Sequence, residues 1–214
     1  MKTPQETTQS CTVCLLKKSC DDQRSNCSIK IEAAKHAEMA RLPGNGDAAY
    51  TKRAVDAFTT AAHIDGASFD EFTEYVAGTS CRLVTIVGAS NKGKTLCAVG
   101  AVQVAIAHRW MLPPDELRFF YSSALEAVDE LERNRFNDES TFDVIIKNAG
   151  LLVLDDFGYG MTEKQSTMLA ALVCVRSDKG KVTFLTCGSL TEMQRVDARF
   201  ARRVIQGRVI HLGA

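Results

Sequence analysis

The stretch that decides the fold runs from residue 83 to residue 97 and reads Leu-Val-Thr-Ile-Val-Gly-Ala-Ser-Asn-Lys-Gly-Lys-Thr-Leu-Cys. Its first five residues are an apolar, β-branched run, which predicts a buried strand over 83–87. The next eight match the pattern G-x-x-x-x-G-K-T, and the Ala/Val-rich stretch 93–107 predicts a helix. This motif binds phosphate when it lies between a strand and a helix, so the context supports more than an incidental lysine in a turn.

Each residue type in the motif has a physical role in holding a nucleoside triphosphate. Gly88 and Gly93 let the backbone curl so that successive N–H groups face the β-phosphate, and the helix directs its positive end at the same anion. Lys94 brings a positive charge to the β- and γ-phosphates, and the Thr95 hydroxyl is a ligand for Mg²⁺. The sequence therefore predicts ATP and Mg²⁺ as cofactors, bound by Gly88, Ala89, Ser90, Asn91, Lys92, Gly93, Lys94, Thr95 and Leu96.

A second, acidic element is expected on a neighbouring strand. Residues 151–156 read Leu-Leu-Val-Leu-Asp-Asp, which is a short apolar strand with two carboxylates at its carboxyl end. Ligand sites in open α/β sheets lie at that end. We expect Asp155 to hold Mg²⁺ with its water shell, and Asp156 to orient or deprotonate the attacking water. The alternative is a pair of aspartates in a plain turn before Phe157.

Apolar runs and amphipathic stretches alternate from residue 82 onward, which predicts a parallel sheet covered by helices on both faces. The region before residue 82 reads as short helices, with a break at Pro43-Gly-Asn-Gly46 that resembles a linker. The predicted strands are 83–87, 117–122, 151–154, 182–187 and 209–212, and the predicted helices are 28–40, 48–62, 68–76, 93–107, 125–133, 162–175 and 190–205.

The phosphate loop and the segment LLVLDDFG at 151–158 together resemble the AAA+ ATPases of the bacterial helicase-loader family, which includes DnaC-like proteins and IstB-type transposition helpers. The resemblance covers about residues 82–212, and its last part is the helical segment 197–204 followed by a short strand. It implies a P-loop NTPase fold of the AAA+/ASCE type over 82–214, without a C-terminal lid. Residues 43–81 would then be a linker with short helices, and residues 1–42 a separate small module.

The resemblance also implies roles for two arginines. Arg203 takes the place of the family's arginine finger, which acts on the ATP of the next subunit in an oligomer, and Arg199 falls on a second recurring arginine. With Lys94 and Asp156, Arg203 completes the expected catalytic set. Asp155 and Asp156 take the Walker B roles.

Two departures from the family pattern affect hydrolysis more than binding. The family's sensor amide is missing at the end of the strand 182–187, so that either Thr186 or Ser189 replaces it or the sensor is lost. The phosphate loop reads Ala89 and Asn91-Lys92 where the family has a proline and a middle glycine. Neither change removes a required ligand.

The function implied by the resemblance is that of an ATPase that loads or remodels a replicative DNA helicase. A transposition helper is the alternative within the same class. A nucleotide-gated adaptor that binds ATP but hardly hydrolyses it is the alternative from another class. A small-molecule P-loop kinase would need an arginine-bearing lid over the phosphates, and no insertion looks like one.

Four cysteines lie within 17 residues, at Cys11, Cys14, Cys20 and Cys27. A C-x-x-C pair presents two thiolates to one ion, and thiolates select zinc or iron–sulfur. We expect zinc, bound by these four thiolates, because so short a segment needs metal to fold; free thiols or a disulfide remain the alternative, and His36 could replace one ligand. By resemblance to some helicase loaders, this module would contact the helicase. The other cysteines, alone in apolar segments, are expected to be buried.

The overall charge excludes a general polycation, because 26 basic residues are balanced by 26 acidic ones. Contact with single-stranded DNA must therefore use a local patch, and five arginines within 14 residues offer one. A solvated basic face is the alternative. The polar N-terminus and the absence of an apolar run of about 20 residues predict a cytoplasmic protein with no membrane contact. The five arginines are Arg195, Arg199, Arg202, Arg203 and Arg208.

Overall fold

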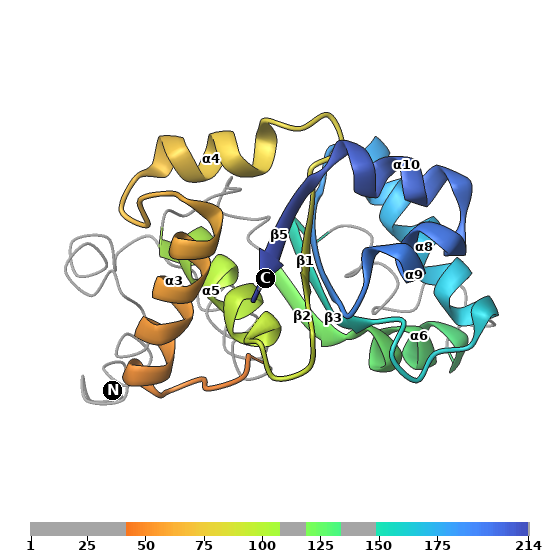
Figure 1. Ribbon diagram of the computed structural model, residues 1–214, viewed down its shortest axis with the longest axis horizontal. Coiled ribbons are helices and arrows are strands. Elements are labelled where there is room, and N and C mark those ends of the chain that lie inside the picture. Colours follow the sequence, from red (N-terminus) through yellow and green to blue (C-terminus); the bar gives the residue numbers. More distant parts are fainter. Residues whose placement is uncertain (1–41, 108–118, 134–148, 214) are drawn as a thin grey trace, which may run out of the picture.

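A five-stranded parallel sheet between two layers of helices forms the centre of the computed structural model, which describes residues 42–107, 119–133 and 149–213 (Figure 1). The strand order is β2-β3-β4-β1-β5, and all four pairings are parallel. The sequence prediction of a five-stranded parallel sheet is therefore confirmed. The strands are β1 (Leu83–Gly88), β2 (Phe119–Ser123), β3 (Leu151–Phe157), β4 (Val182–Cys187) and β5 (Arg208–Leu212).

The helices divide between the two faces of the sheet. One face carries α3 (Ala48–Ala62), α4 (Phe69–Ala77) and α5 (Lys94–Ala107), which lie on the left in Figure 1. The other face carries α6 (Ala124–Arg133), α8 (Glu163–Asp178), α9 (Leu190–Val196) and α10 (Ala198–Gln206). Within the described residues, no helix is long and apolar enough to cross a membrane.

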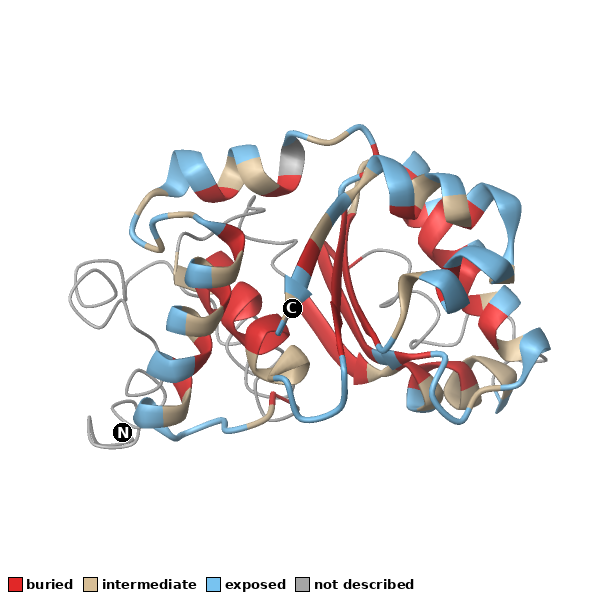
Figure 2. Ribbon diagram, in the orientation of Figure 1, coloured by how far each residue is buried: buried red, intermediate tan, exposed pale blue. Residues whose placement is uncertain are grey.

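The alternation of side chains along each strand explains why the sheet is apolar on both sides. In β1, Val84 and Ile86 join the core under α3, α4 and α5, whereas Leu83 and Val87 join the core under the opposite helices. Every residue of β1 and β4 is buried (Figure 2). Covered strands of this kind read as continuous hydrophobic runs, which is why both were predicted with bounds close to those observed.

Residues 43–81, predicted as a linker with short helices, supply α3 and α4, and both helices pack into the same core as the sheet. The Phe58 ring is fully buried and lies 5.9 Å, centroid to centroid, from Phe184 of β4. Helix α3 lies directly against α5 at Gly100, where a Cβ atom would come within 2.0 Å of the Ala54 carbonyl oxygen. Only glycine fits at this crossing.

The first turns of two helices show how local sequence sets their starts. Ser68 begins α4 as expected, and its Oγ accepts the Glu71 N–H at 3.2 Å. Ser68 and Glu71 form only half of a capping box, because the Glu71 carboxylate accepts the Asp65 N–H instead of the Ser68 N–H. A complete capping box, which the sequence analysis did not identify, begins α8 at Thr162 and Gln165.

One prediction about the sheet is wrong. The acidic strand β3 is not a neighbour of β1, because β4 lies between them. This order places the end of β4 in the middle of the predicted site. The cysteine cluster, His36 and the helix predicted over 28–40 lie outside the described residues. The remaining cysteines, Cys81, Cys97, Cys174 and Cys187, are free and buried, as expected.

Candidate nucleotide-binding site

The phosphate loop connects the carboxyl end of β1 to the first turn of α5, as its sequence predicts. The two positions with positive φ are Asn91, at 64°, and Gly93, at 83°. Gly88 is the last residue of β1 and needs no left-handed backbone, so the interpretation that Gly88 and Gly93 both curl the loop is corrected. Asparagine is one of the few side chains that tolerate this conformation. Asn91 therefore supplies the left-handed conformation in the middle of this loop.

Lys94 is the first residue of α5 and lies over the loop that it follows. Its ammonium group donates a hydrogen bond to the Ala89 carbonyl oxygen at 3.2 Å. Residues 89–92 are exposed, and Gly93 and Lys94 are half-buried. A cation at the positive end of a helix, beside an open loop, is suited to an anionic ligand.

Thr95 and Asp155 are in direct contact, although 60 residues separate them in sequence. The Thr95 hydroxyl donates to Asp155 Oδ2 at 2.7 Å. Thr95 projects from the first turn of α5, and Asp155 lies near the end of β3, two strands away from β1. The structure therefore brings together the two residues predicted as magnesium ligands.

Two further hydroxyl groups surround the Asp155 carboxylate, which is 6% exposed. The Tyr121 hydroxyl, from β2, donates to Oδ2 at 2.6 Å. The Thr186 hydroxyl, from β4, donates to Oδ1. Neither contact was predicted, because hydrogen bonds between separate strands leave no spacing signal in the sequence. Burial, the Asp155 charge and the hydrogen bond all raise the pKa of Tyr121, so its hydroxyl stays protonated and remains a donor.

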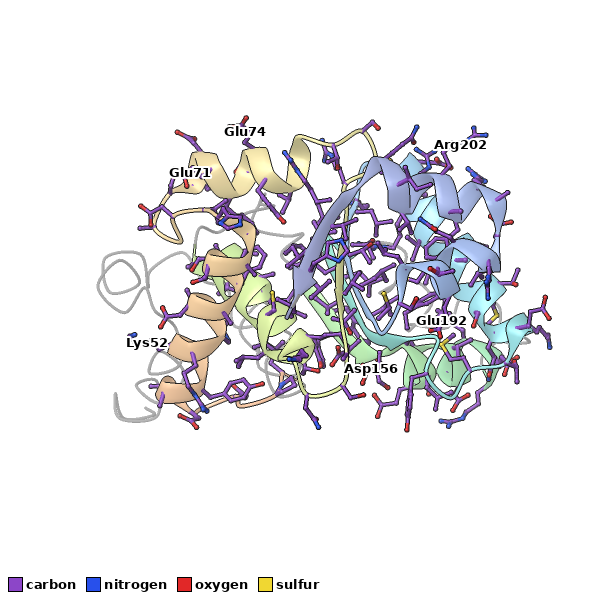
Figure 3. The ribbon with its side chains drawn as sticks, viewed as in Figure 1. Lys52, Glu71, Glu74, Asp156, Glu192 and Arg202 are labelled. Atoms are coloured by element: carbon purple, nitrogen blue, oxygen red, sulfur yellow. The ribbon has the colours of Figure 1, made fainter. Side chains whose placement is uncertain are left out.

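Asp156 differs sharply from its neighbour, because its side chain is exposed at the edge of the sheet (Figure 3). Its backbone has a φ of 55°, an uncommon value for a residue other than glycine. The register between β3 and β4 shifts at this point, and the Asp156 N–H donates to Thr186 Oγ1 at 2.8 Å. Strained backbone of this kind is common at functional sites.

The electrostatics of Asp156 fit an acid–base group. Partial burial and the Asp155 charge raise the pKa of Asp156, whereas the Lys94 charge lowers it. A carboxylate with a raised pKa accepts a proton more readily than an ordinary one. Asp156 is exposed to solvent, whereas Asp155 is largely buried.

Thr186 was proposed as a substitute for the missing sensor amide. Its hydroxyl is fully buried and already makes two hydrogen bonds, to Asp155 and from the Asp156 N–H. Ser189, the other candidate, is the N-cap residue of α9, and its side chain makes no capping hydrogen bond. The Thr186 hydroxyl is therefore already occupied by these two hydrogen bonds, whereas the Ser189 hydroxyl does not cap its helix.

The residues fit a hydrated magnesium ion bound with a nucleotide. A threonine hydroxyl and a carboxylate, 2.7 Å apart beside a lysine-bearing loop, are oxygen ligands of the type that Mg²⁺ prefers. Elsewhere in the described residues, no group of three or more His, Cys, Asp or Glu side chains is arranged to hold a metal ion.

Arg203 and Arg199 lie at the opposite end of the strands and share one acidic partner. Arg203 Nη2 contacts Asp178 Oδ1 at 2.6 Å, and Arg199 Nη2 contacts Asp178 Oδ2. Arg203 also approaches the Cys81 sulfur, which lies just before β1. Figure 3 shows the neighbouring Arg202 on α10, near the top of the view, and Asp156 near the bottom. The structure therefore does not bring Arg203 to the phosphate loop of its own chain.

A shallow groove of about 610 Å³ lies between α3 and the end of β5. It was not predicted, because its lining residues carry no motif in the sequence. Gly213, at one end, lies beside the phosphate loop, because a Cβ atom there would come within 2.9 Å of the Lys92 side chain. Its lining residues are Arg53, Asp56, Ala57, Thr60, Ala61, His63, His211, Leu212 and Gly213.

No family profile matches the chain, and no curated protein matches its sequence. Solved structures do match its fold. The DnaC helicase loader superposes with a TM-score of 0.51 at 16% identity, and the match covers 87% of this chain and 100% of that one. The replication initiator DnaA bound to AMPPCP and single-stranded DNA superposes with a TM-score of 0.54 at 18% identity, covering 68% of this chain.

Domain III of the DnaA protein of Thermotoga maritima gives a TM-score of 0.53 at 18% identity, over 80% of this chain and 63% of that one. The chain spans only 44% of the length of the DnaA structure bound to AMPPCP, and the same share of a structure titled a DNA replication initiation factor. At these identities, the likeness shows the fold alone. The chain therefore shares the α/β fold of these DnaC and DnaA structures.

Proposed function

We propose that this protein binds Mg²⁺ and ATP at the phosphate loop and hydrolyses the ATP. The observation that carries the proposal is the 2.7 Å hydrogen bond from Thr95 to Asp155. Two residues predicted as magnesium ligands from separate motifs lie in contact, which a turn with an incidental lysine would not explain. The fold supports the proposal, since structures with the same fold bind AMPPCP, an ATP analogue.

Different residues would bind the phosphates, activate the water and hold the metal ion. The loop and Lys94 hold the β- and γ-phosphates, and Asp156 orients the attacking water and accepts its proton. A magnesium ion, held by the Thr95 hydroxyl and, through its water shell, by the Asp155 carboxylate, would neutralise charge on the leaving and transferred phosphates. The groove beside Gly213 is adjacent to the loop and is of a size to accept the rest of the nucleotide.

The partner that we propose is a replicative DNA helicase, which this chain would load or remodel in the cytoplasm. The DnaC helicase loader supports this choice, because the match spans its whole length and most of this chain. The support is analogy of fold, and one fold hosts many functions. A transposition helper is the alternative with the same ATP chemistry.

We propose further that the chain assembles as an oligomer in which Arg203 acts on the ATP of the next subunit. Arg203 cannot serve its own site from beside Asp178, so any catalytic role must be in trans. Mixing Arg203→Ala with Asp156→Asn protein should then restore part of the ATPase rate, since one mixed interface pairs an intact site with an intact finger. Mixtures that only average the two mutants' rates, while both still assemble, would leave Arg203 as part of a solvated basic face.

The cysteine cluster completes the proposal as a zinc module that contacts the helicase. Contact with single-stranded DNA through the arginine face is also proposed, because DnaA, which has the same fold, is bound to single-stranded DNA in one structure. Elemental analysis of protein purified without added metal tests the first point. Binding of labelled single-stranded DNA, with and without ATP, tests the second.

Two experiments separate the candidate functions. ATP turnover of wild type against Asp156→Asn distinguishes an ATPase from an adaptor: an ATPase loses its rate, whereas an adaptor shows no rate above background in either protein. Co-purification of the tagged protein from its own cells then identifies a helicase or a transposase. An absence of ATP binding by calorimetry would overturn the proposal as a whole.

A further inference from the structure

Three hydroxyl groups hold the Asp155 carboxylate from three separate elements. Thr95 and Tyr121 both donate to Oδ2, at 2.7 and 2.6 Å, and Thr186 donates to Oδ1. An ionised carboxylate has about four acceptor positions. One position, on Oδ1, therefore has no donor among the described residues.

Tyr121 is the member of this set that no motif accounts for. It is 9% exposed, it comes from β2 at the far end of the sheet from β5, and burial keeps it protonated. Burial raises the pKa of Tyr50, from α3, and the Asp155 charge raises it further. The surroundings of Asp155 thus combine phenol and threonine hydroxyl groups with one other carboxylate, Asp156, and the Lys94 ammonium lies near that carboxylate.

We propose that Tyr121 is a positioning residue for the magnesium site. By occupying Oδ2 together with Thr95, it fixes the rotation of the carboxylate and leaves only Oδ1 to face a magnesium-bound water. Asp155 then enters the site in one orientation before the metal arrives. This inference rests on the proposed function, and it adds a residue that the phosphate-loop and Walker B motifs do not contain.

The physical reason is the freedom that the carboxylate would otherwise have. Without the phenol donor, only the two threonine hydroxyl groups hold the carboxylate, one on each oxygen, so Oδ2 also has an open position that it can offer to the metal shell. Removing a group that orients a metal ligand in this way costs about 10- to 100-fold in metal affinity. Nucleotide affinity in the absence of metal should not change, because Tyr121 contacts no part of the phosphate loop.

The experiment compares Tyr121→Phe with wild type, using Mn²⁺ as the probe and electron paramagnetic resonance to count free metal. We expect Mn²⁺ affinity in the presence of ATP to fall about tenfold or more, and ATP affinity in EDTA to stay within about twofold. Excess Mg²⁺ should restore the ATPase rate of the variant. A residue that only supported the fold would not be rescued by metal.

Tyr75→Phe is the matched control, because Tyr75 is a partly buried tyrosine whose pKa is also raised, and it packs on Phe58 and Arg208 instead of Asp155. It should leave Mn²⁺ affinity unchanged. If Tyr121→Phe does not fold, Thr186→Val removes the Oδ1 donor and should weaken Mn²⁺ binding in the same direction.

The outcomes are distinct. A wild-type protein that binds no ATP sinks the proposed function. A wild-type protein that binds ATP and Mn²⁺, with Tyr121→Phe binding both equally well, sinks only the positioning role. Equal loss of Mn²⁺ affinity in Tyr121→Phe and Tyr75→Phe sinks it too, since that result reports general loosening of the fold.

Discussion

Replacing Thr186 by valine should destabilise the protein by several kcal/mol, although the two side chains have nearly the same shape. The Thr186 side chain is fully buried on β4, and its hydroxyl joins the Asp155 carboxylate to the Asp156 N–H. Valine removes the donor to a charged group, which is worth about 1.5–3 kcal/mol. It also leaves a partly buried N–H without an acceptor, which costs about 1–3 kcal/mol. With some relaxation, we expect a loss of about 2–4 kcal/mol.

Thr85→Val is the matched control. Thr85 is also fully buried, on the adjacent strand β1, but its hydroxyl has no hydrogen-bond partner among the described residues. Burying an unpaired hydroxyl costs free energy, so valine should be neutral there or stabilising by about 1 kcal/mol. The two substitutions make the same chemical change one strand apart, and the predicted free energies of unfolding differ by roughly 3 kcal/mol, within a range of about 2–5 kcal/mol.

Urea unfolding at neutral pH measures this difference directly. For a domain of this size, each kcal/mol corresponds to roughly 2–4 °C in Tm, so thermal unfolding should separate the variants by about 6–12 °C. The Thr186 variant should also hydrolyse ATP more slowly, because the Asp156 backbone loses its anchor. Equal free energies of unfolding for the two variants would refute the role given to the Thr186 hydrogen bonds. Destabilisation by Thr85→Val and not by Thr186→Val would contradict it as well.

Three further outcomes are expected. Lys94→Ala should weaken ATP binding about tenfold or more, since it removes a charged hydrogen-bond donor worth about 1.5–3 kcal/mol, and calorimetry with equal affinities would contradict this. Thiol titration of the native protein should find few reactive groups, and chelation should expose four more if the N-terminal cluster holds zinc. All eight should react only on unfolding, because four cysteines are buried and burial raises the pKa of Cys97 to about 12. The free energy of unfolding should fall as pH rises from about 10 to about 12, because burial raises the pKa of Tyr75 to about 12 and the unfolded chain therefore releases this proton first. Urea unfolding at pH 9 and pH 11 measures this loss of stability. The loss should be smaller in Tyr75→Phe, and an equal loss in both proteins would contradict the prediction.

The parts of the fold that the sequence predicts are those with a strong local pattern. The buried runs at β1 and β4 and the helix α3 have the expected bounds within one residue, because covered strands are continuously apolar and Asp47 caps its helix. The phosphate loop is equally local, since its chemistry lies in eight consecutive residues. These predictions needed no knowledge of which segments meet in space.

Strand order was the point at which local reasoning failed. Nothing in the residues of β3 or β4 states which of them lies beside β1, and the acidic strand was therefore placed one position too close. The consequence is chemical, because inserting β4 brings the Thr186 hydroxyl into contact with both aspartates. Tyr121 escaped prediction for the same reason: an aromatic residue in an apolar strand looks like core until the partner of its hydroxyl is known.

The geometry of Arg203 allows a firmer argument than the sequence did. Its guanidinium lies beside Cys81 and Asp178, at the end of the sheet where β1 and β4 begin. Strands rise about 3.3 Å per residue, so the seven residues from Cys81 to Gly88 place the phosphate loop roughly 20 Å away. An arginine side chain cannot span that distance, and a contribution from Arg203 to hydrolysis must therefore act on another subunit's nucleotide.

Such a subunit has to offer the loop end of its sheet to the arginine end of this one, which is a head-to-tail contact that can close into a ring or continue as a helix. The ion pair with Asp178 must open when that contact forms. Asp178→Asn should then raise the ATPase rate of the assembled protein, whereas a merely solvated arginine face would leave the rate unchanged.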